Sequence, residues 1–91
     1  MRVRAFTSVR DLLGAGDLEI AAGEGTPLRR VLRELAAQHP ALNAKLWDSA
    51  ERPTGQIRLL LNGRSLDTAS GFDTLVSDAD TLGLFAPLGG G

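Results

Sequence analysis

The sequence ends on Thr81-Leu82-Gly83-Leu84-Phe85-Ala86-Pro87-Leu88-Gly89-Gly90-Gly91. The alternation of leucine with glycine and phenylalanine over 81–86 predicts a β-strand with Leu82 and Leu84 on one face. A strand that runs into Pro87 loses a hydrogen-bond donor there, because proline has no amide hydrogen. We therefore expect the folded part of the chain to stop near this proline.

The glycines at the end predict a bare arm. Gly89, Gly90 and Gly91 have no side chains to pack and leave the backbone mobile. We expect one domain over residues 1–87 and a flexible arm over 88–91 that ends in a free carboxylate. Such arms are often linkers or cloning remnants without function. They also suit a protein whose own terminus reacts, because a narrow enzyme channel can admit glycine and bring the carboxylate to a nucleotide phosphate.

A helix is the clearest element upstream of this arm. Apolar residues recur at the spacing of one helical face. This stripe consists of Leu28, Val31, Leu32, Leu35 and Ala36. We expect Thr26 to cap the helix and Pro27 to occupy its first position. The helix should end near His39, because Pro40 cannot continue it.

Alternating patterns predict the other strands. They cover residues 2–7, 17–22 and 57–61. We expect the first two to form a hairpin across the turn at 14–16. Asn62-Gly63 is a strong hairpin signal that leads into a short strand around 64–66.

Three connecting segments complete the chain. Residues 41–47 are expected to form a short helical turn with Trp47 as a cap on the core, and residues 48–56 a loop. Residues 68–77 are rich in turn formers, and their apolar side chains should anchor them to the core. These anchors are Phe72, Leu75 and Val76.

One main helix against a mixed sheet of four or five strands is an α+β two-layer domain. We expect the first and last strands to lie side by side and parallel at its centre, as in a β-grasp.

Composition bounds the function. Ten basic and eleven acidic residues leave a net charge of −1, which argues against a nucleic-acid binder. No run approaches the ~20 apolar residues of a membrane span, and the absence of cysteine removes disulfides, thiolate nucleophiles and zinc–cysteine sites. We expect a cytoplasmic protein with no nucleic-acid or membrane partner.

Five segments match one known pattern in order and spacing. They are Phe6–Gly14, Thr26–Pro40, Leu61–Gly63, Asp78–Leu82 and Phe85–Gly91. Together they resemble the MoaD/ThiS family of ubiquitin-like sulfur carriers over essentially the whole chain. Ala86 stands where that family usually has the first proline of a pair. The loop over 47–56 is longer than in the shortest MoaD proteins and is more similar to cysteine-biosynthesis carriers and archaeal small modifiers.

The resemblance implies that the protein is a reagent and not an enzyme. An adenylating partner of the MoeB/ThiF type would join the Gly91 carboxylate to the α-phosphate of ATP. ATP and Mg²⁺ would bind that partner, so no intrinsic cofactor or metal is expected. Sulfide or a persulfide would then leave a thiocarboxylate that donates sulfur, with Pro87, Leu88, Gly89 and Gly90 as the tail that presents it.

The sequence is compatible with several sulfur acceptors. Arg10 and the first-strand motif favour molybdopterin synthesis, with the large molybdopterin synthase subunit as partner, whereas the long loop favours other pathways such as cysteine or thiamine synthesis. Two further functions also stay open: a ubiquitin-like modifier joined through Gly91 to target lysines, and a β-grasp interaction module with an idle tail.

Strand parity predicts an apolar cluster on the sheet face away from the helix. It contains Phe6, Leu60 and Phe85, flanked by Arg4 and Arg58. We expect these residues, together with Arg10, to bind a partner. Scattered apolar surface residues need no explanation, but a cluster with charged edges is typical of a docking surface. In the family that the chain resembles, a hydrophobic sheet face meets the adenylating enzyme.

No intrinsic active site is expected. His39 is the single histidine and is placed at a helix end, which favours a surface role. Asp78 and Asp80 are interpreted as turn formers and not as a metal pair.

Overall fold

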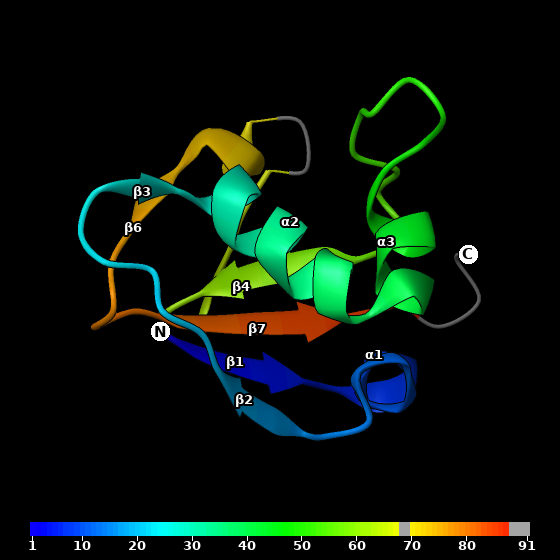
Figure 1. Cartoon of the computed structure of the whole chain (residues 1–91), viewed down its shortest axis with the longest axis horizontal. Coiled ribbons are helices and arrows are strands. Elements are labelled where there is room, and N and C mark those ends of the chain that lie inside the picture. The colour runs from blue at the N-terminus through cyan, green and yellow to red at the C-terminus, as the bar shows by residue number, and fades with distance from the viewer. Residues whose placement is uncertain (68–69, 88–91) are drawn as a thin grey trace.

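A parallel pair of strands lies at the centre of the structure (Figure 1). The computed structural model describes residues 1–67 and 70–87. The five strands of the main sheet, in spatial order, are β2 (Asp17–Glu19), β1 (Arg2–Ala5), β7 (Thr81–Phe85), β4 (Arg58–Leu61) and β5 (Arg64–Ser65). β1 and β7 are parallel, with Val3 opposite Leu82, and the other pairs are antiparallel.

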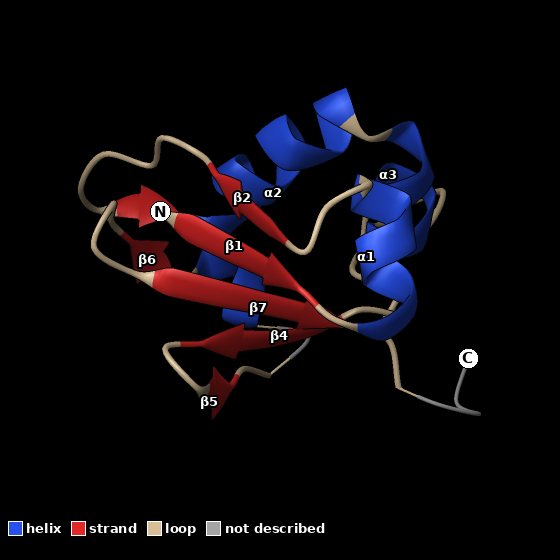
Figure 2. Ribbon diagram, turned by 90° about the horizontal axis from the view of Figure 1, so that it is seen from below, coloured by secondary structure: helices blue, strands red, loops and turns tan. Residues whose placement is uncertain are grey.

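Helices cover one face and one end of this sheet. They are α1 (Thr7–Leu13), α2 (Leu28–Gln38) and α3 (Pro40–Leu46). α2 lies across one face, while α1 and α3 lie at the end of the sheet where β7 finishes (Figures 1 and 2). The β-grasp arrangement expected from the sequence is therefore confirmed, with two short helices in addition to the main one.

The core lies between α2 and the inner face of the sheet. Val3, Leu82 and Leu84 on the central strands are fully buried, as are Leu28 and Leu32 on α2. Burying a side chain of this size is worth about 1.5–3 kcal/mol. The predicted helical stripe and the predicted inward face of β7 are both confirmed.

The segment between β1 and β2 differs from the prediction. β1 ends at Ala5, and the chain then forms α1 instead of a direct hairpin. Val9 and Leu13, one helical turn apart, are both buried. Gly14, with φ of 73°, ends the helix in the left-handed conformation. β2 is also shorter than the predicted strand over 17–22, because only residues 17–19 pair with β1.

The start of the main helix also differs. Thr26 and Pro27 form β3, which pairs with β6 (Leu75–Val76) in a separate two-stranded sheet. Pro27 occupies the N-cap position, and the Thr26 hydroxyl donates to the Ala22 carbonyl instead of capping the helix. A pairing with a segment almost fifty residues away decides this local structure.

The segment between β5 and β7 is anchored by two of its three predicted residues. Phe72, in the 3₁₀ turn η1 (Gly71–Asp73), and Val76 are buried. Leu75 is 63% exposed, so its prediction as an anchor is wrong. As a residue of β6 it alternates with Val76, which takes the inward side.

Trp47 caps the core as predicted. Its ring is nearly buried and meets the Phe72 ring edge to face, with 5.8 Å between centroids. Two arginines of α2 cover these rings, with Arg33 4.7 Å from the Trp47 centroid and Arg29 5.6 Å from that of Phe72.

Within residues 1–67 and 70–87, the helices are too short to cross a bilayer.

Candidate functional site

The outer face of the sheet, opposite α2, carries the predicted apolar cluster. Phe6, Thr7, Leu60 and Phe85 line an open hollow of about 300 Å³. Phe6 is 38% exposed, and Leu60 and Phe85 are half-buried. We call Phe6, Leu60 and Phe85 the outer-face patch. The structure brings the three together, whereas their role in binding stays a prediction.

The missing side chain of Gly83 leaves space in which the residues of the outer-face patch can pack together. A Cβ at this position would lie 3.2 Å from Cε2 of Phe6 and 3.3 Å from Cβ of Leu60. These two side chains therefore approach each other over a bare stretch of β7. Sequence reasoning missed this role, although an isolated glycine within a strand is a signal of close approach.

Positive charge borders the patch on both sides. The Arg4 guanidinium lies 6.0 Å from the Phe6 ring centroid and forms an ion pair with Asp17 at 3.3 Å. Arg58 is exposed on β4, directly opposite Phe85. The predicted arrangement of an apolar centre with arginines at its edges is therefore present.

Arg10 lies elsewhere. Its guanidinium packs against Gly16, in the connection between α1 and β2, where a Cβ would lie 3.4 Å from Nε. The structure thus does not bring Arg10 together with the outer-face patch, although the sequence grouped them as partner-binding residues.

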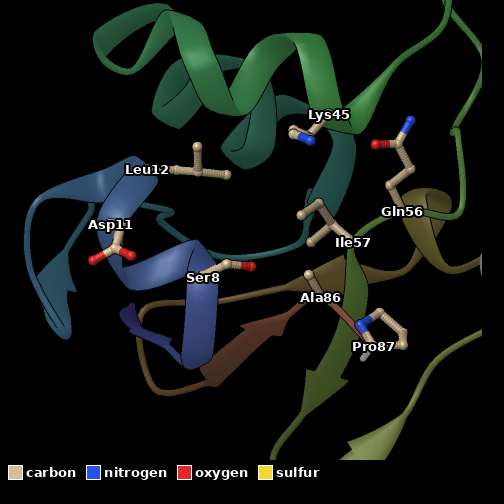
Figure 3. A pocket seen from close by; sticks show the side chains of 8 residues that line it. All are labelled: Ser8, Asp11, Leu12, Lys45, Gln56, Ile57, Ala86 and Pro87. Carbon is tan, nitrogen blue, oxygen red and sulfur yellow. The ribbon is translucent and has the colours of Figure 1, made fainter. Parts of the chain in front are cut away.

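A second hollow lies at the root of the C-terminal arm (Figure 3). It has a volume of about 340 Å³ and is formed by α1, α3 and the ends of β4 and β7. Leu12 and Ile57 supply apolar wall, Lys45 lies on the α3 side, and Ala86 and Pro87 form the side from which the arm begins. We call this the tail-root pocket. Sequence reasoning missed it, because its walls come from four separate segments.

The tail residues themselves were predicted as the reacting end. Pro87 is half-buried at the tail-root pocket. Leu88, Gly89, Gly90 and Gly91 lie outside the described residues, so the prediction for them is carried by sequence alone.

The two aspartates before β7 are turn formers. Asp78 Oδ1 accepts a hydrogen bond from the Ala22 amide at 2.7 Å, and this bond is the largest cause that holds the pKa of Asp78 below its usual range. The Asn62 side chain and the Ser77 amide, in that order, lower the pKa of Asp80. No cluster of metal-ligating side chains occurs among the described residues.

Asn62 ties the hairpin to this turn. It has a φ of 51°, pairs with Gly63 in the predicted two-residue turn, and donates its side-chain amide to Asp80 at 2.9 Å. Its side-chain oxygen accepts from the Thr81 amide, also at 2.9 Å. These contacts fix the start of β7, the strand that leads to the arm.

Comparison with known proteins agrees with this geometry. The family model described as the ThiS family matches residues 3–91. Small archaeal modifier protein 3 of Haloferax volcanii is 27% identical over 92 residues, which cover 100% of this chain and 98% of that protein.

Solved structures show the same fold. The solution structure of small archaeal modifier protein 1 from Methanosarcina acetivorans superposes with a TM-score of 0.81 at 26% identity, covering 99% of this chain and 94% of that one. The crystal structure of the Amycolatopsis orientalis BexX/CysO complex contains a chain with a TM-score of 0.76 at 23% identity, with 99% and 98% covered.

Proposed function

Because the chain belongs to the ThiS family, a family of ubiquitin-like sulfur carriers and modifiers, we propose that its Gly91 carboxylate is the group that reacts. An adenylating enzyme joins this carboxylate to the α-phosphate of ATP. Sulfide then displaces AMP, and the terminus becomes a thiocarboxylate that donates sulfur. When a persulfide attacks instead, it forms an acyl disulfide, and a thiol must cleave the S–S bond to release the thiocarboxylate. The chain is the co-substrate of these steps and not their catalyst.

The chemistry explains why a partner is needed. A carboxylate is a poor acyl donor, because oxide or hydroxide would have to leave. Forming the acyl adenylate releases pyrophosphate and installs AMP, which leaves with the electron pair of the C–O bond when sulfur attacks. ATP and Mg²⁺ bind the partner in this scheme, so the chain needs no cofactor of its own.

The course of β7 is the observation that carries the proposal. This strand lies at the centre of the sheet, is hydrogen-bonded on both sides, and leads directly through Ala86 and Pro87 into the arm. Phe85, its last residue, belongs to the outer-face patch. A partner that binds the patch therefore meets the root of the arm at the same time, and the rigid sheet fixes the direction in which the arm enters an active site.

The partners follow from the same arrangement. We assign the outer-face patch to the adenylating enzyme, with Arg4 and Arg58 meeting acidic groups at its rim. The resemblance of residues 6–14 to MoaD favours molybdopterin synthesis as the pathway, with the large synthase subunit as acceptor. Cysteine, thiamine and other sulfur-containing products are the competing assignments.

A second candidate function is protein modification through Gly91. It is favoured by two relatives above 25% identity that are both named small archaeal modifier proteins. In that case the activated Gly91 acyl group passes to a lysine of a target protein, and digests of cellular proteins contain isopeptide-linked glycine remnants. The two functions share the adenylation step and differ in the nucleophile.

Intact-mass analysis tests the leading proposal. The chain is incubated with an adenylating enzyme, ATP, Mg²⁺ and sulfide, and the expected product is heavier by the difference between one sulfur and one oxygen. A chain that lacks Gly90 and Gly91 is the matched control and should not change. An unchanged mass of the full chain, with an enzyme that charges its own carrier in the same assay, would contradict the proposal.

A further inference from the structure

The tail-root pocket borders the same end of β7 as the outer-face patch. Phe85 lies directly opposite Arg58 and lines the hollow of the outer face. The residues next to this pair, Ala86 and Ile57, line the tail-root pocket instead. One step along either strand therefore leads from the outer-face patch to the tail-root pocket. A protein that encloses Ala86 and Pro87 contacts both surfaces.

The helical walls of the pocket are anchored in the core. α1 supplies Ser8, Asp11 and Leu12, whose spacing puts them on one side of the helix. α3 supplies Lys45, whose backbone carbonyl accepts a hydrogen bond from the Thr54 hydroxyl. Other side chains of the two helices are buried, namely Val9, Leu13, Leu42 and Leu46. The pocket is therefore formed before any partner binds.

Opposite charges lie on two sides of this pocket. Asp11 is on the α1 side and Lys45 on the α3 side, while Leu12 and Ile57 supply apolar wall (Figure 3). Both charged side chains are exposed, and within residues 1–67 and 70–87 neither forms an ion pair. The complementary surface is an apolar side chain with a carboxylate on its α3 side and a basic group on its α1 side.

We propose that the tail-root pocket is a second docking surface for the adenylating enzyme. The enzyme places an apolar side chain in the pocket, a carboxylate against Lys45 and a basic group against Asp11. This inference rests on the proposed adenylation of the chain. Contacts on both sides of the end of β7 fix the rotation of the chain about this strand, which contacts on the outer-face patch alone fix less well. Such orientation favours the reaction that follows binding.

Isothermal titration calorimetry of the full chain with the adenylating enzyme, in the absence of ATP, measures docking by itself. Lys45→Glu is expected to lower the affinity at least about ten-fold, the lower range for a close charge pair across an interface. Lys45→Arg keeps the positive charge and should retain the wild-type affinity. Equal affinities of Lys45→Glu and the wild type would overturn the proposal.

Two further variants separate a local contact from the effect of net charge. Arg30→Glu changes the net charge as Lys45→Glu does, but Arg30 is exposed on α2 and lines neither the outer-face patch nor the tail-root pocket. It should bind as the wild type does. Asp11→Lys makes the chain more positive and should nevertheless weaken binding, because it opposes the basic group of the enzyme. If Arg30→Glu weakens binding as much as Lys45→Glu, or Asp11→Lys strengthens it, net charge explains the results and the proposal is wrong.

Release of pyrophosphate from ATP, measured on the same proteins, separates this inference from the proposed function. If the wild type is adenylated but Lys45→Glu and Asp11→Lys bind as tightly as the wild type, the second docking surface is wrong and the proposed function stands. If both variants bind weakly but an enzyme that is active on its own carrier releases no pyrophosphate with the wild type, adenylation fails and the docking surface stands.

Analytical ultracentrifugation of the free chain tests whether a second copy covers the pocket. A monomeric wild type is the expected result. A wild-type dimer that Lys45→Glu converts to monomers would show that the pocket binds a second copy and would overturn the proposal.

Discussion

Gly83 determines how the outer-face patch is built. Its missing side chain leaves room for Phe6 and Leu60 to meet over β7, and a Cβ would come within 3.3 Å of both. Cβ of Leu60 is fixed to the neighbouring strand and cannot move aside without moving β4. A larger side chain at this position must therefore displace Phe6 or separate the strands.

Gly83→Val is expected to lower the free energy of unfolding by about 1–3 kcal/mol, the usual cost of overpacking. The higher strand propensity of valine does not offset this cost, because the clash is with a neighbouring strand. Urea denaturation measures the change. Thr81→Val, two residues earlier on the same face of β7, is the control and should stay within about 0.5 kcal/mol of the wild type. Equal stability of both variants would show that the space over residue 83 is not needed.

Asp78 links stability to pH at the other end of β7. Its folded-state pKa lies below the usual range because the amides of Ala22 and Gly23 donate to its carboxylate. A depressed folded pKa contributes stability above the unfolded pKa of about 3.9, and this contribution is lost as pH falls through the folded value.

Asp78→Asn is therefore expected to lower the melting temperature at pH 6 and to weaken the loss of stability between pH 4 and pH 2. Thermal melts at a series of pH values measure both effects. If the melting temperatures of the wild type and the variant fall in parallel below pH 4, Asp78 does not cause the loss of stability in acid.

At the scale of elements, the outer face of the sheet is where a partner is expected to bind. Leu60→Glu places a carboxylate between Phe6 and Phe85 and between the two bordering arginines. Because a hot-spot residue at the centre of an interface costs about 2 kcal/mol or more when it is lost, we expect affinity for the adenylating enzyme to fall at least about 30-fold. Isothermal titration calorimetry measures it.

The matched control is Leu75→Glu. Leu75 is more exposed than Leu60 and belongs to β6, in the separate two-stranded sheet. This variant should bind as the wild type does. If it weakens binding as much as Leu60→Glu, the interface does not lie on the outer-face patch.

The elements also show what periodicity could predict. α2 and β7 were found from sequence because each buries one face, so their apolar residues recur at 3.6 and 2 residues. The Asn62-Gly63 turn was found because its positive φ values require such residues. α1 and β3 were missed. α1 has only one turn of apolar spacing, and β3 exists through its pairing with β6.

In the whole molecule, the outer-face patch and the tail-root pocket both lie near the end of β7. The outer-face patch and the tail-root pocket lie on either side of the point where β7 gives way to Ala86 and Pro87. Strand parity was enough to predict the first surface. The second could not be predicted, because the packing of α1 against α3 decides which side chains meet Lys45. Arg10 was grouped with the patch through the family resemblance, and the fold places it elsewhere.

At this scale, we propose that the fold presents Gly91 to another protein, which charges it with sulfur. Trypsin has no site after Arg64, so the tail is released as the single peptide Ser65–Gly91. After incubation with adenylating enzyme, ATP, Mg²⁺ and sulfide, tandem mass spectrometry should place one oxygen-to-sulfur exchange on the last residue of this peptide. An unmodified peptide from a reaction that has consumed ATP, or sulfur at any other residue, would contradict the claim.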